Sequence, residues 1–183
     1  MTKVTNRTST VDIGAGTAVI GNVGLEAGEE FIGLVGMTDD VIEITCSLDT
    51  NAYADGDVLF DTQEIASAVR NAGDSCILQS VHVLDEDDQG EDFELIFFDA
   101  NQSLGTENSA PDITDSEARD IIGHYAFSND YVDLGACQIR TDYGIGLELK
   151  TDGSTSLWVA GLSKGTGTYT ATGIRIKFCF LRN

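Results

Sequence analysis

From residue 41 to the end of the chain, apolar and polar residues alternate in a series of short segments. Successive side chains of a β-strand point to opposite faces, so this period of two predicts strands with at least one covered face. The clearest segment sets Ile174, Ile176, Phe178 and Phe180 opposite Arg175, Lys177 and Cys179. The strands predicted in this way are 41–48, one or two within 57–69, then 76–84, 93–99, 135–141, 145–151, 156–162 and 173–181.

This series of strands predicts a fold class. Twenty glycines against a single proline suit the many tight turns of an all-β chain. Segment 114–122 has the signals of a short helix, with Thr114 or Asp115 as its N-cap. We therefore predict an all-β fold, an antiparallel β-sandwich that is jelly-roll-like and has one short helix. The predicted core residues are Leu78, Leu95, Phe97, Leu147, Trp158, Phe178 and Phe180.

The beginning of the chain has a different pattern. Residues 12–36 are rich in glycine and small apolar residues and show no sustained period. Such a segment is suited to lying along another surface. We therefore predict an extended N-terminal arm over residues 1–40, followed by a single β-sandwich domain over residues 41–183.

The sequence DEDDQGED, residues 85–92, carries six carboxylates in eight positions. Its first half resembles a calcium-binding loop, but such a loop needs flanking helices and a bidentate glutamate at position twelve. Here position twelve is Ile96, and predicted strands flank the octet on both sides. Gly90 supplies a turn signal, so we predict a mobile, solvated hairpin tip that binds no specific metal ion.

The formal net charge of −21 restricts the classes of partner that we expect. A surface of this charge repels phosphates, so we expect no nucleic-acid partner. The chain has no apolar run of roughly 20 residues and its start is unlike a signal peptide, so we expect no membrane partner and synthesis in the cytosol. Residues 12–152 contain all 31 acids. This split favours an arrangement in which the two acid-free ends face a partner and the acidic middle faces water.

Residues with catalytic or metal-binding chemistry form no motif in the sequence. His82 and His124 are the two histidines, and no G-x-S-x-G segment marks a nucleophile beside them. Among 31 acids, paired carboxylates carry almost no information about glycoside hydrolysis. We therefore expect no enzyme activity, no cofactor and no metal site. The four cysteines favour buried thiols and leave disulfides open, because Cys46, Cys76, Cys137 and Cys179 lie far apart in apolar segments.

Three segments, NAYADGDVLFDTQEI, LIFFDANQSLGTENSAPDITDSEARDIIGHYAF and SLWVAGLSKGTGTYTATGIRIKFCFL, resemble those of small structural proteins of tailed bacteriophages. In those proteins a Y-a-x-G-D turn precedes a β-sandwich, and an F-d-x-n-x-x…D stretch crosses the middle of the chain. The resemblance covers residues 50–183, with Glu107 in place of an expected aspartate, and leaves the arm without a counterpart. Proteins of this kind are similar to capsid decoration, or cement, proteins.

The resemblance implies a virion structural protein that decorates and stabilises the bacteriophage capsid. It would dock on the major capsid protein at the outer surface of the capsid, after synthesis in the bacterial cytoplasm, and form a homotrimer. Two alternatives stay open: a tail- or fibre-associated binding module, for example for carbohydrate, and a hydrolase of unassigned class. The residues expected to bind the partner are the small apolar residues of the arm, Val11, Ile13, Val19, Ile20 and Val23, together with the acid-poor face near the C-terminus.

Overall fold

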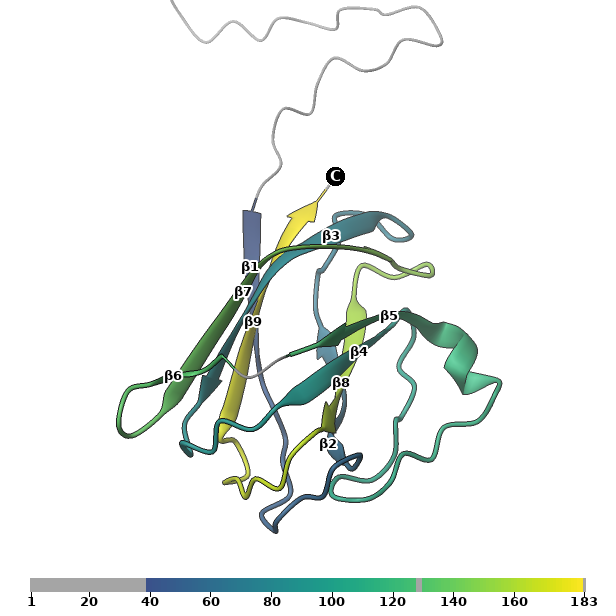
Figure 1. The fold of residues 1–183 in the computed structure, drawn as a ribbon. Helices are drawn as coiled ribbons and strands as arrows, with labels where there is room; N and C mark the ends of the chain where they lie inside the picture. Colours follow the sequence, from purple (N-terminus) through teal and green to yellow (C-terminus); the bar gives the residue numbers. More distant parts are fainter. Residues whose placement is uncertain (1–38, 128–129, 183) are drawn as a thin grey trace, which may run out of the picture. The chain divides into compact units, whose positions relative to one another are not determined.

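The computed structural model describes residues 39–127 and 130–182 (Figure 1). Of the predicted arm, it describes only Asp39 and Asp40, which begin the first strand. The predicted binding residues of the arm, Val11, Ile13, Val19, Ile20 and Val23, lie outside the described residues. The described elements are β1 (Asp39–Thr45), β2 (Val58–Ile65), β3 (Ser75–Asp85), β4 (Phe93–Phe98), the 3-10 turn η1 (Glu117–Asp120), β5 (Ile121–Ala126), β6 (Val132–Asp133), β7 (Gln138–Lys150), β8 (Leu157–Ser163) and β9 (Ile174–Arg182).

These strands form two antiparallel sheets. Sheet A has the order β1-β9-β3-β7-β6, and sheet B has the order β2-β8-β4-β5. The pairs are nested along the chain, because β1 pairs with β9, β2 with β8, β3 with β7 and β4 with β5. Two sheets built from such nested pairs have the topology of a jelly roll. The predicted all-β sandwich is confirmed.

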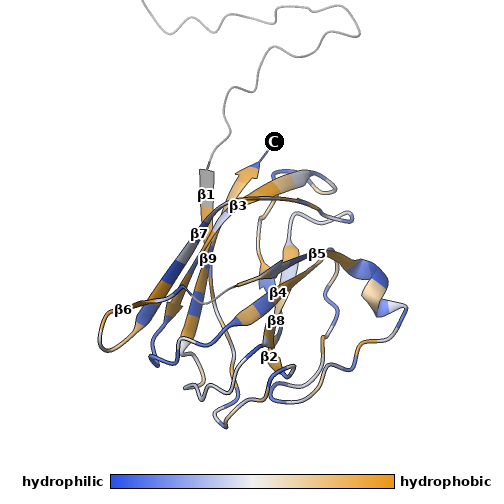
Figure 2. Cartoon of the chain, in the orientation of Figure 1, coloured by the Kyte–Doolittle hydropathy of each residue, from blue (hydrophilic) through white to orange (hydrophobic). Residues whose placement is uncertain are grey.

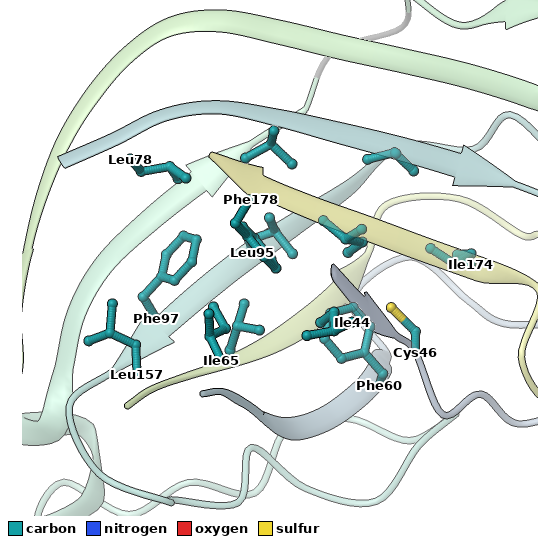
Figure 3. Packing of buried hydrophobic residues seen from close by; sticks show 14 of the residues in the cluster. Ile44, Cys46, Phe60, Ile65, Leu78, Leu95, Phe97, Leu157, Ile174 and Phe178 are labelled. Carbon is teal, nitrogen blue, oxygen red and sulfur yellow. The ribbon is translucent and has the colours of Figure 1, made fainter. Parts of the chain in front are cut away.

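The main hydrophobic core lies between the two sheets (Figure 3). Sheet A contributes the inward positions of β9 and β3, and sheet B contributes those of β4 and β8. The period-two prediction is confirmed at these positions, where Leu78, Leu95, Phe97, Phe178 and Phe180 are fully buried. Leu147 and Trp158 were expected in the same core and are only partly buried.

Trp158 belongs to a second, smaller cluster on the other face of sheet B. Its neighbours along β8 point inward, so Trp158 points outward, where it packs with Phe98 and Leu104. The connection over residues 99–120 covers this face, and Asp61 holds it in place. The Asp61 carboxylate accepts hydrogen bonds from the Leu104 backbone N–H at 2.7 Å and from the Ser103 hydroxyl at 2.8 Å. Sheet B therefore has both of its faces covered by the chain itself.

The predicted helix over residues 114–122 is a 3-10 turn of four residues, Glu117–Asp120. Thr114 and Glu117 close its start, because the Glu117 carboxylate accepts hydrogen bonds from the Thr114 backbone N–H at 2.8 Å and hydroxyl at 2.7 Å. Ile121 then begins β5, where the chain pairs with β4. The two β-branched residues at 121–122 suit that strand and end the helix early.

Residues 135–151 were expected to form two strands with a turn between them. They form one long strand, β7, which contains Gly144 and Gly146 as a bulge. Both glycines have positive φ angles, 68° and 70°. Their turn-like backbone is thus accommodated inside a strand, and the prediction of two separate strands, 135–141 and 145–151, was wrong.

The acidic octet 85–92 is also arranged differently from the prediction. It joins β3 of sheet A to β4 of sheet B, so it crosses between the sheets and is not a hairpin tip. Asp85 is 2% exposed and accepts hydrogen bonds from three backbone N–H groups of the octet, at distances of 2.7 to 3.0 Å. Asp87 also accepts a hydrogen bond from the Thr170 backbone N–H at 2.7 Å. Hydrogen bonds to the carboxylates of the octet therefore hold the crossover in its conformation and attach it to the 165–173 loop.

Candidate docking surface

Exposed apolar side chains gather on sheet A. Six large hydrophobic residues are exposed among the described residues, and four of them, Val41, Ile77, Val132 and Tyr143, lie on strands of this sheet. A fifth, Leu134, lies in the hairpin that joins β6 to β7. Apolar positions recur along β1, β3 and β9 in Figure 2. We call the side of sheet A that points away from the core its outer face.

The strand register places these side chains in rows across the outer face. Val41 on β1 lies opposite Cys179 on β9, which lies opposite Ser80 on β3, which lies opposite Tyr143 on β7. Nearer the β6–β7 hairpin, Leu84 on β3, Ile139 on β7 and Val132 on β6 form a second row. Arg175 on β9 continues the second row beside Leu84. The outer face therefore has a first row without charged residues, a polar row with Glu43, Lys177 and His82, and a second row that is apolar only from β3 to β6.

The charges in the polar row and beside it, around Arg175, nearly balance. Arg175 forms an ion pair with Glu86 at 2.9 Å and lies 3.6 Å from Glu43, while Lys177 lies 3.4 Å from Glu43. Glu86 raises the pKa of Arg175 by a hydrogen bond and by its charge. Two cations and two carboxylates thus balance on this part of the face.

This arrangement corrects the expectation of an acid-poor face near the C-terminus. The last strand, β9, has no acid of its own, but it lies between β1 and β3. β1 supplies Glu43, and the crossover that follows β3 supplies Glu86, both from distant parts of the sequence. The acid-free sequence of β9 therefore does not give an acid-free surface, and the charges around this strand balance in a protein of net charge −21.

His82 lies in the polar row, between Lys177 on β9 and Thr141 on β7. Its Nδ1 atom is 2.7 Å from the Thr141 hydroxyl. Burial lowers the pKa of His82, and the charge of Lys177 lowers it further. The ring is therefore neutral at pH 7, and the balance of charge on the outer face holds at that pH.

A second ionic cluster lies inside the sandwich. Arg140 on β7 is 5% exposed and makes two hydrogen bonds to Asp142, at 2.9 and 3.0 Å. The Tyr125 hydroxyl of β5 donates to the same carboxylate, and the guanidinium lies 5.3 Å from the centre of the Phe127 ring. Partial burial raises the pKa of Asp142, but the hydrogen bonds from Arg140 and Tyr125, together with the charge of Arg140, lower it below its usual value. The cluster ties sheet A to sheet B and serves the fold.

The remaining candidate groups offer little chemistry. Within residues 39–127 and 130–182, no three His, Cys, Asp or Glu side chains are placed to hold a metal ion. Over the same ranges, no helix is long and apolar enough to cross a membrane. The four cysteines are free thiols: Cys46 and Cys76 are buried, and Cys137 and Cys179 are half-buried. His124 lies 3.3 Å from Glu94 at the surface.

The apolar residues of the outer face can be found in the sequence, but the alternation of apolar and polar residues did not show that they would be exposed. In segment 76–84 both alternating sets contain apolar residues, which is compatible with a strand covered on one face or on both. The structure buries Leu78, Val81 and Val83, and leaves Ile77 partly exposed on the opposite side. Val41 on β1 and Tyr143 on β7 are likewise exposed hydrophobic residues at outward positions of their strands.

Comparison with known proteins adds little to this description. No protein-family model matches the sequence, and no curated protein matches it. One solved structure, of infectious bursal disease virus strain Gx, is similar to part of the chain at 16% sequence identity and a TM-score of 0.19. The match covers 79% of this chain, which spans 36% of that viral chain. A TM-score this low carries no argument, so function is argued below from the chain's own residues.

Proposed function

We propose that this protein is a structural protein of a bacteriophage virion that decorates and stabilises the capsid. It docks on the major capsid protein at the outer surface of the capsid, and it acts by binding and not by catalysis. It needs no cofactor and binds neither nucleic acid nor membrane. The resemblance in residues 50–183 supports the virion assignment, and the outer face of sheet A supports the docking mode.

The observation that carries the docking proposal is a neutral apolar face on a protein of net charge −21. Exposed patches of apolar residues mark interaction sites on soluble proteins. Another protein can approach this face without the repulsion that the acidic remainder of the chain exerts on anionic surfaces. The apolar area of the face can be buried against a partner, and its low charge lets that partner approach without repulsion.

The arm and the outer face belong to the same proposed contact. The described chain begins at Asp39, which pairs with Leu181 at one end of sheet A (Figure 1). In this proposal the apolar residues Val11, Ile13 and Val19 of the arm add area to the contact that the outer face makes. On the particle the protein forms a homotrimer, whose acidic surfaces face water.

The test uses two isoleucines that differ mainly in position. Ile77 on the outer face is 38% exposed, and Ile121 on β5 of sheet B is 37% exposed. Ile77→Glu and Ile121→Glu add the same charge and remove the same side chain. We expect Ile77→Glu to weaken binding to undecorated heads about ten-fold or more and Ile121→Glu to change it by less than about three-fold. Equal losses for the two variants would remove the outer face as the docking site.

The location on the particle is tested separately. Quantitative gel staining of purified particles should give several hundred copies of a head decoration protein per virion. A few copies per particle, released with the tails, would favour the alternative of a tail- or fibre-associated binding module.

A further inference from the structure

Tyr143 is the most exposed large hydrophobic residue of the described chain, at 80%. It lies on β7, within sheet A, and not in a loop. Its neighbours in the same row, Ser80 and Cys179, are half-buried, so the Tyr143 ring stands above its surroundings. A tyrosine in this position has a large apolar ring and a hydroxyl available to a partner.

The backbone beside Tyr143 is specialised. Leu78 pairs with Leu147 and Ser80 pairs with Tyr143, so β7 places three residues where β3 places one. Gly144 and Gly146 are two of those three and have φ angles of 68° and 70°. A Cβ atom at either glycine would meet nothing within 4 Å, so the backbone conformation, and not crowding, favours glycine there. Bulges of this kind re-aim a side chain, and here the side chain beside the bulge is Tyr143.

The surroundings of Tyr143 define the partner that it fits. Val41 lies in the same row, three strands away, which corresponds to about 14 Å. Ile77 lies close to this row on β3, and the next row toward the β6–β7 hairpin is the neutral polar one. The row that contains Tyr143, with Ser80, Cys179 and Val41, therefore has no charged residue, whereas the chain as a whole carries −21. Charge complementarity then selects an apolar pocket on a surface with net positive charge around it.

We propose that Tyr143 is the anchor of the docking face: its ring enters an apolar pocket, rimmed by positive charge, on the major capsid protein. The bulge at Gly144 and Gly146 holds the ring at the angle that the pocket requires. Tyrosine is enriched among the few interface residues that dominate binding energy, which agrees with an anchor on an otherwise flat sheet face. This inference rests on the proposed function, because the occupant is the shell protein. A second copy of the chain fits less well, since it brings another −21 to the contact.

The experiment measures binding of labelled full-length protein to purified undecorated heads. We expect Tyr143→Ala to weaken binding about 30-fold. Tyr143→Phe keeps the ring and loses only the hydroxyl, so it should weaken binding about three-fold. The double variant Gly144→Ala/Gly146→Ala retains Tyr143 but strains the bulge, and we expect a loss of binding between these two. Tyr143→Ala and Tyr143→Phe should keep the wild-type midpoint of denaturant unfolding to within a small shift, since Tyr143 is exposed. The glycine variant should unfold at a lower denaturant concentration, because alanine is strained at the positive φ angles of the bulge.

The possible outcomes separate this inference from the proposed function. If Tyr143→Ala binds heads as tightly as wild type while Ile77→Glu does not, Tyr143 is not the anchor and the docking face stands. If Tyr143→Ala lowers self-association in sedimentation and leaves head binding unchanged, the occupant is a second copy and the anchor proposal is overturned. If the wild-type protein fails to bind heads, both proposals are overturned. Tyr143→Ala leaves Gly144 and Gly146 unchanged, so its binding to heads tests the anchor proposal even if the glycine variant does not fold.

Discussion

The outer faces of the two sheets differ in how far the described chain covers them. On sheet B, the connection over residues 99–120 covers Phe98, Ala160 and Trp158, and Asp61 fixes it there by hydrogen bonds. On sheet A, the corresponding face leaves Val41 and Tyr143 exposed. The chain thus completes one face by itself and leaves the other without a cover from the described residues.

Stability and binding therefore depend on different faces of the sandwich. Apolar residues on the outer face of sheet B lose contact with water on folding and contribute to the free energy of unfolding. Apolar residues on the outer face of sheet A remain in water after folding, so they contribute to binding or to nothing. Residues of similar type, at equivalent outward positions, are therefore expected to respond to mutation in different assays.

The largest expected effect is on the covered face. Phe98 is fully buried in the second cluster, so Phe98→Ala leaves a cavity and should lower the free energy of unfolding by about 3–5 kcal/mol. Denaturant melts at fixed pH measure it, with Phe178→Ala in the main core as a reference of similar size. A loss below about 1 kcal/mol at Phe98 would mean that the 99–120 connection does not seal sheet B.

A smaller effect is expected where the cover is fastened. Asp61→Ala removes the acceptor for the Leu104 N–H and the Ser103 hydroxyl, and should cost about 1–2 kcal/mol. Asp61→Asn keeps one acceptor oxygen and should cost less. Amide hydrogen exchange of Leu104 gives a local readout, because its protection depends on this bond. Unchanged exchange in Asp61→Ala would contradict a fastening role.

The alternation of apolar and polar residues predicted most of the fold, because burial between two sheets imposes a period of two wherever one face is covered. It placed Phe178 and Phe180 in the core and gave nearly the bounds of β9. It misplaced Trp158, because a residue on the far face of a sheet can also be covered, and only the path of the 99–120 connection decides that.

Other features depend on contacts that are distant in the sequence. A turn between strands reads the same whether the strands pair or belong to different sheets, so residues 85–92 resembled a hairpin tip. The neutrality of the outer face needed Glu43 and Glu86 to meet Arg175 across 132 and 89 positions, the differences 175 − 43 and 175 − 86. Tyr143 stood next to glycines that signalled a turn, and only the pairing with β3 shows a bulge within a strand.

Acid pH should weaken sheet A slightly through His82. Burial, and next the charge of Lys177, lowers the pKa of His82 in the folded protein, so the unfolded chain takes up a proton first as the pH falls. The free energy of unfolding should therefore decrease from about pH 6.5 down to the lower folded pKa and not change further from this source. Comparing wild type with His82→Gln over that range isolates the effect. Identical pH profiles for the two proteins would show that His82 does not contribute.

The smallest expected change in stability comes from the uncovered face itself. The double variant Val41→Thr/Ile77→Thr keeps β-branched side chains on the strands and removes apolar surface that is already exposed, so the free energy of unfolding should change by less than about 0.5 kcal/mol. Its effect should instead appear in binding to undecorated heads. Added salt screens the repulsion between chains of charge −21, so wild-type protein should self-associate more at high salt.

Sedimentation over a range of salt concentrations then measures how far association depends on the outer face. We expect the double variant to bind undecorated heads more weakly than wild type and to self-associate as wild type does at high salt, because the shell protein and not a second copy occupies the outer face. A loss of stability above about 1 kcal/mol would indicate that Val41 and Ile77 are covered within the folded chain, and the contrast between the two sheets would not hold. Self-association that is weaker than that of wild type at high salt would place the self-contact of the trimer on the outer face of sheet A, and would contradict the capsid protein as the occupant of that face.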